Sequence, residues 1–372
     1  MGKTALILGT NAGQADIINF LKESGWQVHS CGHKKEGPGC DLAHQFHLVN
    51  TTDVEAVKVL ATAIHADIVY SVSSDVNIRT ATAVSEALHL PVLASSNFID
   101  LFHYKDRLRQ FLNDHNISTV EYRKVANTNQ AKDWNAFPCV VKPVDSQGQR
   151  GVSLVADKSE FEQTLNAALK SSSSNTAIIE EYLKGVEFST NMIVQNGKVL
   201  INEFTERYVH GTHLFGLPKG HAIPCRNIDR DTVMKAAKMT EQLVEKLQIK
   251  NAVLYIQMVA TEQGPKIIEV APRLDGCHIW RLLLHARSYD LRAYAINCLI
   301  GKDAGEALPC NIPNQPEYTL MFNQMPTGET FSIEKNPVPK STVYKEYRYK
   351  DGEKVQPING KLEVVGYYVY KD

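Results

Sequence analysis

The chain has 372 residues, and this length predicts two or three domains rather than a single core. The formal net charge of −1 argues against nucleic acid or an anionic membrane surface as a partner, and no apolar run approaches the length of a membrane span. The seven cysteines are scattered and include no CxxC pair, a usage typical of reduced thiols in a cytoplasmic protein.

The first 95 or so residues alternate between strand and helix patterns. Strands are predicted over residues 4–9, 26–30, 67–72 and 91–94, and helices over 12–22, 54–64 and 78–88. This alternation predicts a parallel, doubly wound sheet. The first turn, Gly9-Thr10-Asn11-Ala12-Gly13, is not a G-x-G-x-x-G loop, and no acidic residue ends the second strand. Both observations argue against a dinucleotide-dependent dehydrogenase.

Two groups of polar residues in this segment have alternative interpretations. Ser74 and Asp75 follow a strand end, where open α/β sheets bind substrates, but Ser and Asp more often cap the next helix, and we favour capping. A second group contains zinc-type ligands, but its spacing matches no standard zinc site and favours an ordinary His-rich loop: Cys31, His33, Cys40, His44 and His47.

Two lysines and a glycine loop mark the middle of the chain. Residues 97–112 are predicted as a helix that carries Lys105, and residues 138–143 as a strand that contains Lys142. A lysine within an apolar strand needs a partner. The following loop, residues 145–152, has two glycines, which let backbone N–H groups approach phosphate oxygens. These features predict a phosphate clamp that is not a Walker loop.

Further strands follow from residue 177. Residues 177–189 read as a strand, a short connector and a second strand, and Asn196-Gly197 is a strong two-residue hairpin turn. Residues 206–221 are predicted as a long loop, and such loops are usually functional or disordered. The loop offers three basic candidates for a phosphate contact, among which the sequence does not choose: His210, His213 and Lys219.

The run from residue 252 to 276 predicts a β-hairpin in which Gln257 and Glu269 face each other across the strands. Their face would also carry Val253, Tyr255, Ile267 and Ala271, and the core face Leu254, Ile256, Met258, Ile268 and Val270. A carboxylate in an apolar hairpin needs a cation, and oxygen ligands beside Arg273 suit a magnesium-bound phosphate. The alternative is an edge hairpin with one wet face. The hairpin alone does not decide between them.

Helices are predicted over residues 231–247, as core packing, and over 279–300. A substrate carboxylate could lie at the start of the second helix, near Gly276, because helix N-termini favour anions. Arg281 is then a candidate partner, although a surface arginine is the commoner outcome. The tail, residues 301–372, is expected to form a β-rich module without identifiable chemistry, with strands such as 318–322 and 364–370.

The ordered series of Lys105, Lys142 with its glycine loop, Glu180-x-x-Leu-x-Gly-x-Glu187, and Gln257 with Glu269-x-x-x-Arg273 resembles the ATP-grasp superfamily across roughly residues 1–300. Within it, the chain resembles L-amino-acid ligases and carbamoyl-phosphate-synthase-like proteins. The resemblance implies a mixed α/β and α+β fold with a Rossmann-like pre-ATP-grasp domain at 1–95, an ATP-grasp domain at 96–300 and the β-rich module at 301–372. The lid subdomain would span about 117–183.

The resemblance also implies a role for each motif. ATP phosphates would meet Lys105, Lys142 and the lid loop with Gln147, Gly148 and Gly151. The adenine would lie against Glu180 and the backbone of Glu181, Tyr182 and Leu183, and the ribose would meet Glu187. Magnesium would bind Gln257 and Glu269, and Arg273 would contact the transferred phosphate. Ala271 stands where the family usually has asparagine as a second metal ligand, so the number of magnesium ions stays open.

The implied activity is that of a cytoplasmic ATP-dependent carboxylate–amine ligase. ATP would phosphorylate a carboxylate, and an amine (or a thiol) would attack the acyl phosphate, with ATP and Mg²⁺, or Mn²⁺, as cofactors. The partners would be small molecules, and a homodimer is compatible with the sequence. Two alternatives remain: a small-molecule kinase on the same fold, and a nucleotide-binding regulator without catalysis, which Ala271 motivates. The sequence identifies neither the acid nor the amine.

Overall fold

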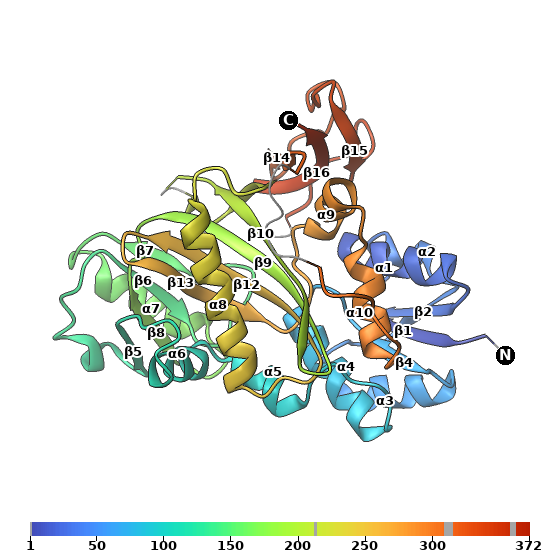
Figure 1. Cartoon of the computed structure of the whole chain (residues 1–372), viewed down its shortest axis with the longest axis horizontal. Helices are drawn as coiled ribbons and strands as arrows, with labels where there is room; N and C mark the ends of the chain where they lie inside the picture. The colour runs from blue at the N-terminus through green and yellow to red at the C-terminus, as the bar shows by residue number, and fades with distance from the viewer. Residues whose placement is uncertain (1, 212–213, 309–314, 358–361) are drawn as a thin grey trace.

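The computed structural model describes residues 2–211, 214–308, 315–357 and 362–372, so the candidate His213 lies outside the described residues. Figure 1 shows an N-terminal region (blue), a smaller lobe on the opposite side (green) and a long sheet between them. The C-terminal strands (red) extend that long sheet rather than forming a sheet of their own.

The N-terminal region is the predicted parallel sheet, with strand order β3-β2-β1-β4. Its elements are β1 (Thr4–Leu8), α1 (Ala12–Glu23), β2 (Gln27–Gly32), α2 (Gly39–Leu42), β3 (Gln45–Leu48), α3 (Val54–Ala63), β4 (Ile68–Tyr70) and α4 (Asp75–Ala87). The apolar residues of β1, β2 and β4 are buried on both faces, as the βαβ connection requires, whereas Leu48 at the end of the edge strand β3 is exposed. Ser74 caps α4, because its hydroxyl accepts a hydrogen bond from Asn77 N at 3.4 Å, as favoured from the sequence.

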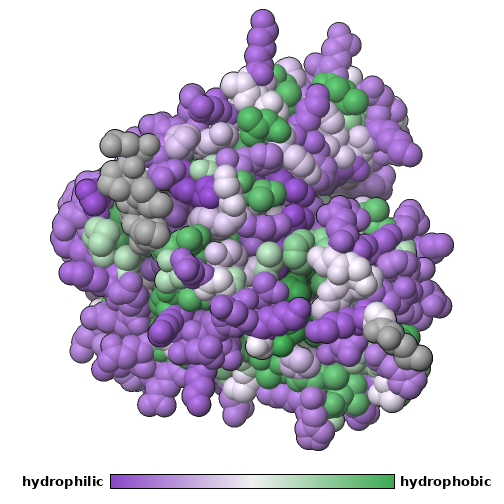
Figure 2. Space-filling model, turned by 45° about the vertical axis from the view of Figure 1, so that its right-hand side comes forward, coloured by the Kyte–Doolittle hydropathy of each residue, from purple (hydrophilic) through white to green (hydrophobic). Residues whose placement is uncertain are grey.

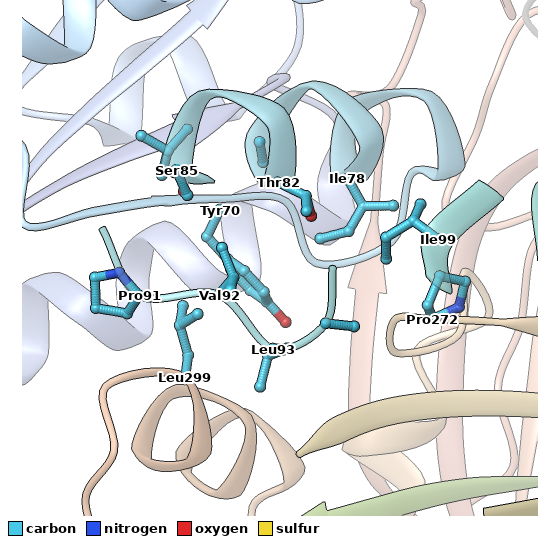
Figure 3. A pocket seen from close by; sticks show the side chains of 13 residues that line it. Tyr70, Ile78, Thr82, Ser85, Pro91, Val92, Leu93, Ile99, Pro272 and Leu299 are labelled. Atoms are coloured by element: carbon cyan, nitrogen blue, oxygen red, sulfur yellow. The ribbon is translucent and has the colours of Figure 1, made fainter. Parts of the chain in front are cut away.

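Residues 91–94 do not form the strand that the sequence predicted there. They run without ladder hydrogen bonds past β4 and α4, where Pro91, Val92 and Leu93 line a cavity of about 10 Å³ together with Tyr70 (Figure 3). The apolar run is therefore explained by partial burial against the core rather than by strand pairing, and Pro91 could not donate to a ladder.

The predicted helix over 97–112 is broken into two helices at Tyr104, whose backbone is extended: α5 (Ser96–His103) and α6 (Lys105–Asp114). The break lets Lys105 N donate to Val144 O at 3.1 Å and places Lys105 in the first turn of α6. The smaller lobe follows, with the antiparallel order β5-β8-β6-β7. Its elements are β5 (Tyr122–Val125), η1 (Thr128–Ala131), β6 (Cys139–Pro143), β7 (Ser153–Val155), α7 (Phe161–Ser171) and β8 (Ala177–Glu181).

The long sheet has the order β13-β12-β9-β10-β11-β14-β16-β15. Its strands are β9 (Val186–Gln195), β10 (Lys198–Val209), β11 (Pro218–Ile223), β12 (Ala252–Thr261), β13 (Gly264–Ala271), β14 (Tyr318–Pro326), β15 (Thr342–Tyr347) and β16 (Leu362–Lys371). Helix α8 (Arg230–Lys246) packs its apolar stripe, including Val233 and Leu243, on one face. Helices α9 (Ile279–Arg287) and α10 (Leu291–Leu299) lie between the sheet and the N-terminal region (Figure 1).

Two predictions for the second half of the chain need correction, whereas the predicted strands of the tail are present. The predicted long loop over 206–221 is mostly strand, because β10 continues to Val209 and β11 begins at Pro218. The predicted helix over 279–300 is two helices, separated by Ser288 with φ 59° and by Asp290, which caps α10. The strands of the tail are hydrogen-bonded to the long sheet through β11 and β14.

The hairpin of β12 and β13 has the predicted pairing of Gln257 with Glu269, but the predicted faces are only partly right. A β-bulge follows this pair, so that Met258 pairs with Ile267. The extra residue reverses the alternation: Ile267 joins the core, and Ile268 lines a cavity together with Glu269. Val253, Tyr255 and Ala271 on the Glu269 face are also buried, so this face is not the solvent-exposed face of an edge hairpin.

The face of the molecule in Figure 2 is mostly hydrophilic, and hydrophobic residues reach it in separate patches. The exposed large hydrophobic side chains, such as Leu48, Met234 and Val343, come from distant elements. None of the helices in the described ranges combines the length and the apolar character that a membrane span requires.

Candidate functional site

A cavity of about 270 Å³ lies between the smaller lobe and the β12–β13 end of the long sheet. It collects most of the residues to which the sequence assigned a nucleotide or metal: Lys105, Lys142, Gln147, Gly148, Glu180, Glu181, Tyr182, Leu183, Glu187, His210, Gln257 and Glu269. The lining also contains Arg109, Gln149 and Phe215, which the sequence did not single out.

Glu180 joins two cations at one end of the cavity. Arg109 Nε donates to Glu180 Oε1 at 2.7 Å, and the Lys142 ammonium pairs with Glu180 Oε2. The Glu180 side chain is only 6% exposed. Burial favours its neutral form, but Arg109 and Lys142 outweigh burial and lower the pKa of Glu180 to about 2. The side chain of Glu180 therefore holds Lys142, the mid-strand lysine that needed a partner.

Arg109 was missed in the sequence, although its spacing gave a signal. It lies four residues after Lys105, and this interval places both cations on one face of α6. Besides Glu180, Arg109 Nη1 donates to Ile267 O at 3.0 Å. This bond ties α6 to the strand next to the bulge and leaves the arginine buried.

The loop of residues 145–152 covers one side of the cavity. Its backbone has positive φ at Gly148, Gln149 and Gly151, with values of 63°, 61° and 74°. The Lys105 ammonium donates to Ser146 O, and the Gln149 side chain donates to Gly216 O in the connector between β10 and β11. Gly151 is directed away from the cavity, because a Cβ there would lie 2.8 Å from Pro143.

The connector between β8 and β9 forms a slot with apolar walls. Glu181 N and Tyr182 N are already hydrogen-bonded to Glu121 O and Pro138 O, at 3.0 and 3.2 Å. Leu183 N donates to no acceptor among the described residues. Gly185 packs against β12 so closely that a Cβ would lie 2.0 Å from Ala260 O. The slot thus presents a free backbone donor beside apolar side chains such as Phe215.

Glu187 is held on one oxygen and free on the other. Arg207 Nη1 donates to Glu187 Oε2 at 2.5 Å, and Gln257 Nε2 donates to the same oxygen at 2.9 Å. Arg207 Nη2 also donates to Gly216 O at 3.0 Å. The sequence placed Arg207 in a loop, so its partnership with Glu187 was missed. Glu187 Oε1 accepts no hydrogen bond from the described residues, and the residue lines the cavity.

Glu269 is the unpaired carboxylate of the cavity. It is half-buried, and within the described ranges no hydrogen bond or ion pair reaches it. The Gln257 side-chain N–H donates to Glu187. The Gln257 side-chain oxygen therefore remains free to accept, on the strand opposite Glu269. Hard divalent cations prefer such oxygens.

A cation at Glu269 would need further ligands. No cluster of three or more His, Cys, Asp or Glu side chains in the described parts of the chain is arranged to hold a metal ion. Ala271 is buried opposite Tyr255 and supplies no ligand atom. The donor set therefore fits a magnesium ion only if phosphate oxygens and water complete its coordination, which is the usual arrangement for magnesium.

The remaining predicted site residues do not line this cavity. Ser74 caps α4, Gly276 lies in open space before α9, and Lys219 is half-buried on β11. Arg281 Nη2 donates to Asp16 Oδ1 at 2.8 Å. Arg281 is therefore part of a largely buried ion pair, and is neither a lining residue of this cavity nor an ordinary surface arginine.

Asp75 and Arg273 also lie outside this lining and form an ion pair with each other. Arg273 Nε donates to Asp75 Oδ1 at 2.5 Å and Nη2 donates to Oδ2 at 2.7 Å. Burial favours the neutral form of Asp75, but Arg273 outweighs burial and lowers the pKa of Asp75.

Comparison with known proteins gives a domain match for the part of the chain that contains much of the cavity lining. Residues 135–280 match the family model of the ATP-grasp domain. Formate-dependent phosphoribosylglycinamide formyltransferase from Prochlorococcus marinus is 25% identical over 253 residues, which cover 66% of this chain and 61% of that protein. The chain thus spans about three fifths of the length of that relative.

Two solved structures share the fold over the whole chain. The L-amino acid ligase from Bacillus licheniformis has a TM-score of 0.80 at 15% identity and matches 100% of this chain and 93% of its own. The N5-carboxyaminoimidazole synthetase from Staphylococcus aureus, solved with ADP, has a TM-score of 0.77 at 16% identity and matches 100% and 94%.

Proposed function

We propose that this chain, which carries an ATP-grasp domain, is an ATP-dependent ligase that activates a small carboxylate as an acyl phosphate and joins it to an amine, with release of ADP and phosphate. The observation that carries the proposal is Glu269, an unpaired half-buried carboxylate opposite the Gln257 oxygen, in a cavity that also contains Lys105 and Lys142. A half-buried carboxylate with no hydrogen-bond or ion-pair contact favours the binding of a cation beside it.

The lining residues fit the parts of a nucleotide. The free Leu183 N and the apolar slot suit an adenine, and the free Glu187 Oε1 suits the ribose hydroxyls. Lys105 and Lys142, with the glycines of the 145–152 loop, would neutralise and enclose the phosphates. Gln257 and Glu269 would hold a magnesium ion, which when bound neutralises phosphate charge and orients the transferred group.

The proposed reaction needs positioning and charge neutralisation more than it needs a side-chain nucleophile. The acid would approach the terminal phosphate near Arg273, beside a small adjoining cavity that Glu269 and Pro272 line. Arg273 would stabilise the negative charge on the transferred phosphoryl group. The amine would then displace phosphate from the acyl phosphate, and the closed 145–152 loop would keep water away.

The test is substrate-dependent release of ADP over a panel of amino acids and other small carboxylates, with ammonia and amines as acceptors. Glu269→Ala should abolish this release, whereas Glu262→Ala, an exposed glutamate in the turn of the same hairpin, should leave it unchanged. Near wild-type turnover in Glu269→Ala would refute the assignment.

Mass spectrometry of the product separates the ligase from the alternatives. A ligase yields the amide, whereas a kinase yields a stable phosphorylated product and no amide. Binding of MgATP without turnover across the panel would favour the non-catalytic regulator, for which the missing metal ligand at Ala271 is the supporting observation.

A further inference from the structure

The ion pair between Asp75 and Arg273 connects the N-terminal region to the candidate site. Asp75 is the first residue of α4, and Arg273 follows the end of β13. The two side chains are 16% and 11% exposed, and both carboxylate oxygens accept from the guanidinium. Arg273 Nη1 also donates to Leu274 O at 3.0 Å. Three of the five guanidinium N–H groups are therefore fixed, and one remains on each terminal nitrogen.

A small cavity of about 20 Å³ lies beside Asp75 and shares part of its lining with the nucleotide cavity. Asp75, Lys105, Gln147 and Glu269 all line it, and Lys105, Gln147 and Glu269 also line the larger cavity. The charges alternate from Arg273 to Asp75, Lys105 and Glu269, and each neighbouring pair interacts electrostatically. Asp75 thus lies between the arginine expected at the transferred phosphate and the lysine expected at the nucleotide.

We propose that Asp75 is a positioning residue for phosphoryl transfer: its carboxylate fixes the orientation of Arg273, so that the two free N–H groups are presented to the transferred phosphate. This inference rests on the proposed function. A free arginine side chain has many rotamers, and a bidentate carboxylate removes this freedom before the substrate arrives. The Asp75 carboxylate also offsets the positive charge of Arg273. It therefore weakens the binding of a phosphate to Arg273, although it improves the orientation of the guanidinium for transfer.

The two effects of Asp75 predict a separation of binding from catalysis in Asp75→Asn. The amide cannot accept from both Nε and Nη2, so the orientation of Arg273 is lost and kcat should fall at least about tenfold. The local negative charge is lost as well, so the MgADP-loaded variant should bind inorganic phosphate as tightly as the wild type or a few-fold more tightly. Calorimetry with MgADP and inorganic phosphate measures the second quantity without knowledge of the acid.

Matched variants distinguish positioning from simple support of the fold. Asp16→Asn removes another buried ion pair between the N-terminal region and the core, at Arg281, and should lower the thermal midpoint without changing kcat. Asp75→Glu keeps the carboxylate and should recover part of kcat. Arg273→Lys cannot form the bidentate pair and should reproduce the loss, and combining it with Asp75→Asn should add little further loss.

Several results would overturn the inference. A kcat within twofold of the wild type in a folded Asp75→Asn protein would make the pair merely structural. A higher kcat would mean that Asp75 masks Arg273, and a phosphate Kd more than tenfold weaker would mean that Asp75 supports binding instead. If Asp75→Asn does not fold, the Arg273→Lys variant replaces it in the test. A wild-type kcat in Arg273→Lys would then show that the ion pair is merely structural. Turnover in Glu269→Ala would instead refute the proposed function, and the phosphate titration would still report on Asp75.

Discussion

Replacement of Glu180 by glutamine tests the buried charge cluster at the end of the cavity. The variant keeps the size of the side chain but leaves Arg109 and Lys142 as two buried cations without a shared anion. The pKa of Glu180 is lowered from 4.5 to about 2, which corresponds to about 3 kcal/mol in favour of the charged form at neutral pH. Breaking a buried ion pair typically costs about 3–5 kcal/mol. We therefore expect Glu180→Gln to lose about 3 kcal/mol of unfolding free energy.

The pH dependence of this loss follows from the direction of the shift. Because the folded pKa lies below the unfolded value, the contribution of Glu180 is fully present above about pH 4.5 and is lost as the pH falls towards 2. Urea unfolding of wild type and variant should give a constant difference between pH 5 and 8 and a smaller difference at lower pH.

Glu203→Gln is the matched control. Glu203 is another buried carboxylate, but its cation, Arg287, lies 3.5 Å away, and burial raises the pKa of Glu203. A raised pKa means that the charged form is unfavourable in the folded protein, so Glu203→Gln should be neutral or slightly stabilising at pH 7. A loss below about 1 kcal/mol in Glu180→Gln, or an equal loss in both variants, would refute the reasoning.

Two further predictions concern stability. The Tyr70 hydroxyl is buried beside Leu93 (Figure 3) and has no hydrogen-bond partner within the described residues, so Tyr70→Phe should leave the thermal midpoint unchanged or raise it; a clear fall would reveal a partner such as a buried water. Gly185→Ala should lower the thermal midpoint and weaken MgATP binding, because the new Cβ would lie 2.0 Å from Ala260 O beside the proposed adenine slot. Gly276→Ala is the control, since a Cβ there would have no atom within 4 Å, and it should be tolerated in the same thermal-shift titration with MgATP.

Local patterns predicted the local features of the site. The turn and the alternation of β12 and β13 were enough to pair Gln257 with Glu269, because register in a hairpin depends on its turn. The bulge was not predictable in the same way, since Ile267 and Ile268 are identical residues and either could face the core. Polar residues on a buried strand face misled the prediction at β10, where Arg207 was assigned to a loop.

Ion pairs between residues that are distant in the sequence could not be predicted from the sequence. Arg109 and Glu180 are 71 residues apart, and Asp75 and Arg273 are 198 residues apart. Arg109 and Asp75 each have an ordinary local explanation, as a residue of helix α6 and as the first residue of helix α4. Only the folded structure shows which carboxylate compensates which cation, because it brings α6 to Glu180 on β8 and α4 to Arg273 after β13.

The distribution of these pairs bears on how a nucleotide would bind. Lys142 and Arg109 share Glu180, Arg207 is paired with Glu187, and Arg273 is paired with Asp75. The cations around the cavity are thus largely neutralised by the protein itself, and a triphosphate would bring several further negative charges beside the unpaired Glu269. This balance disfavours metal-free ATP and favours a nucleotide that carries its own divalent cation to Glu269 and Gln257. On the proposed function, Glu269 would therefore determine which form of the nucleotide binds, and the held Arg273 would act on the phosphate only at transfer.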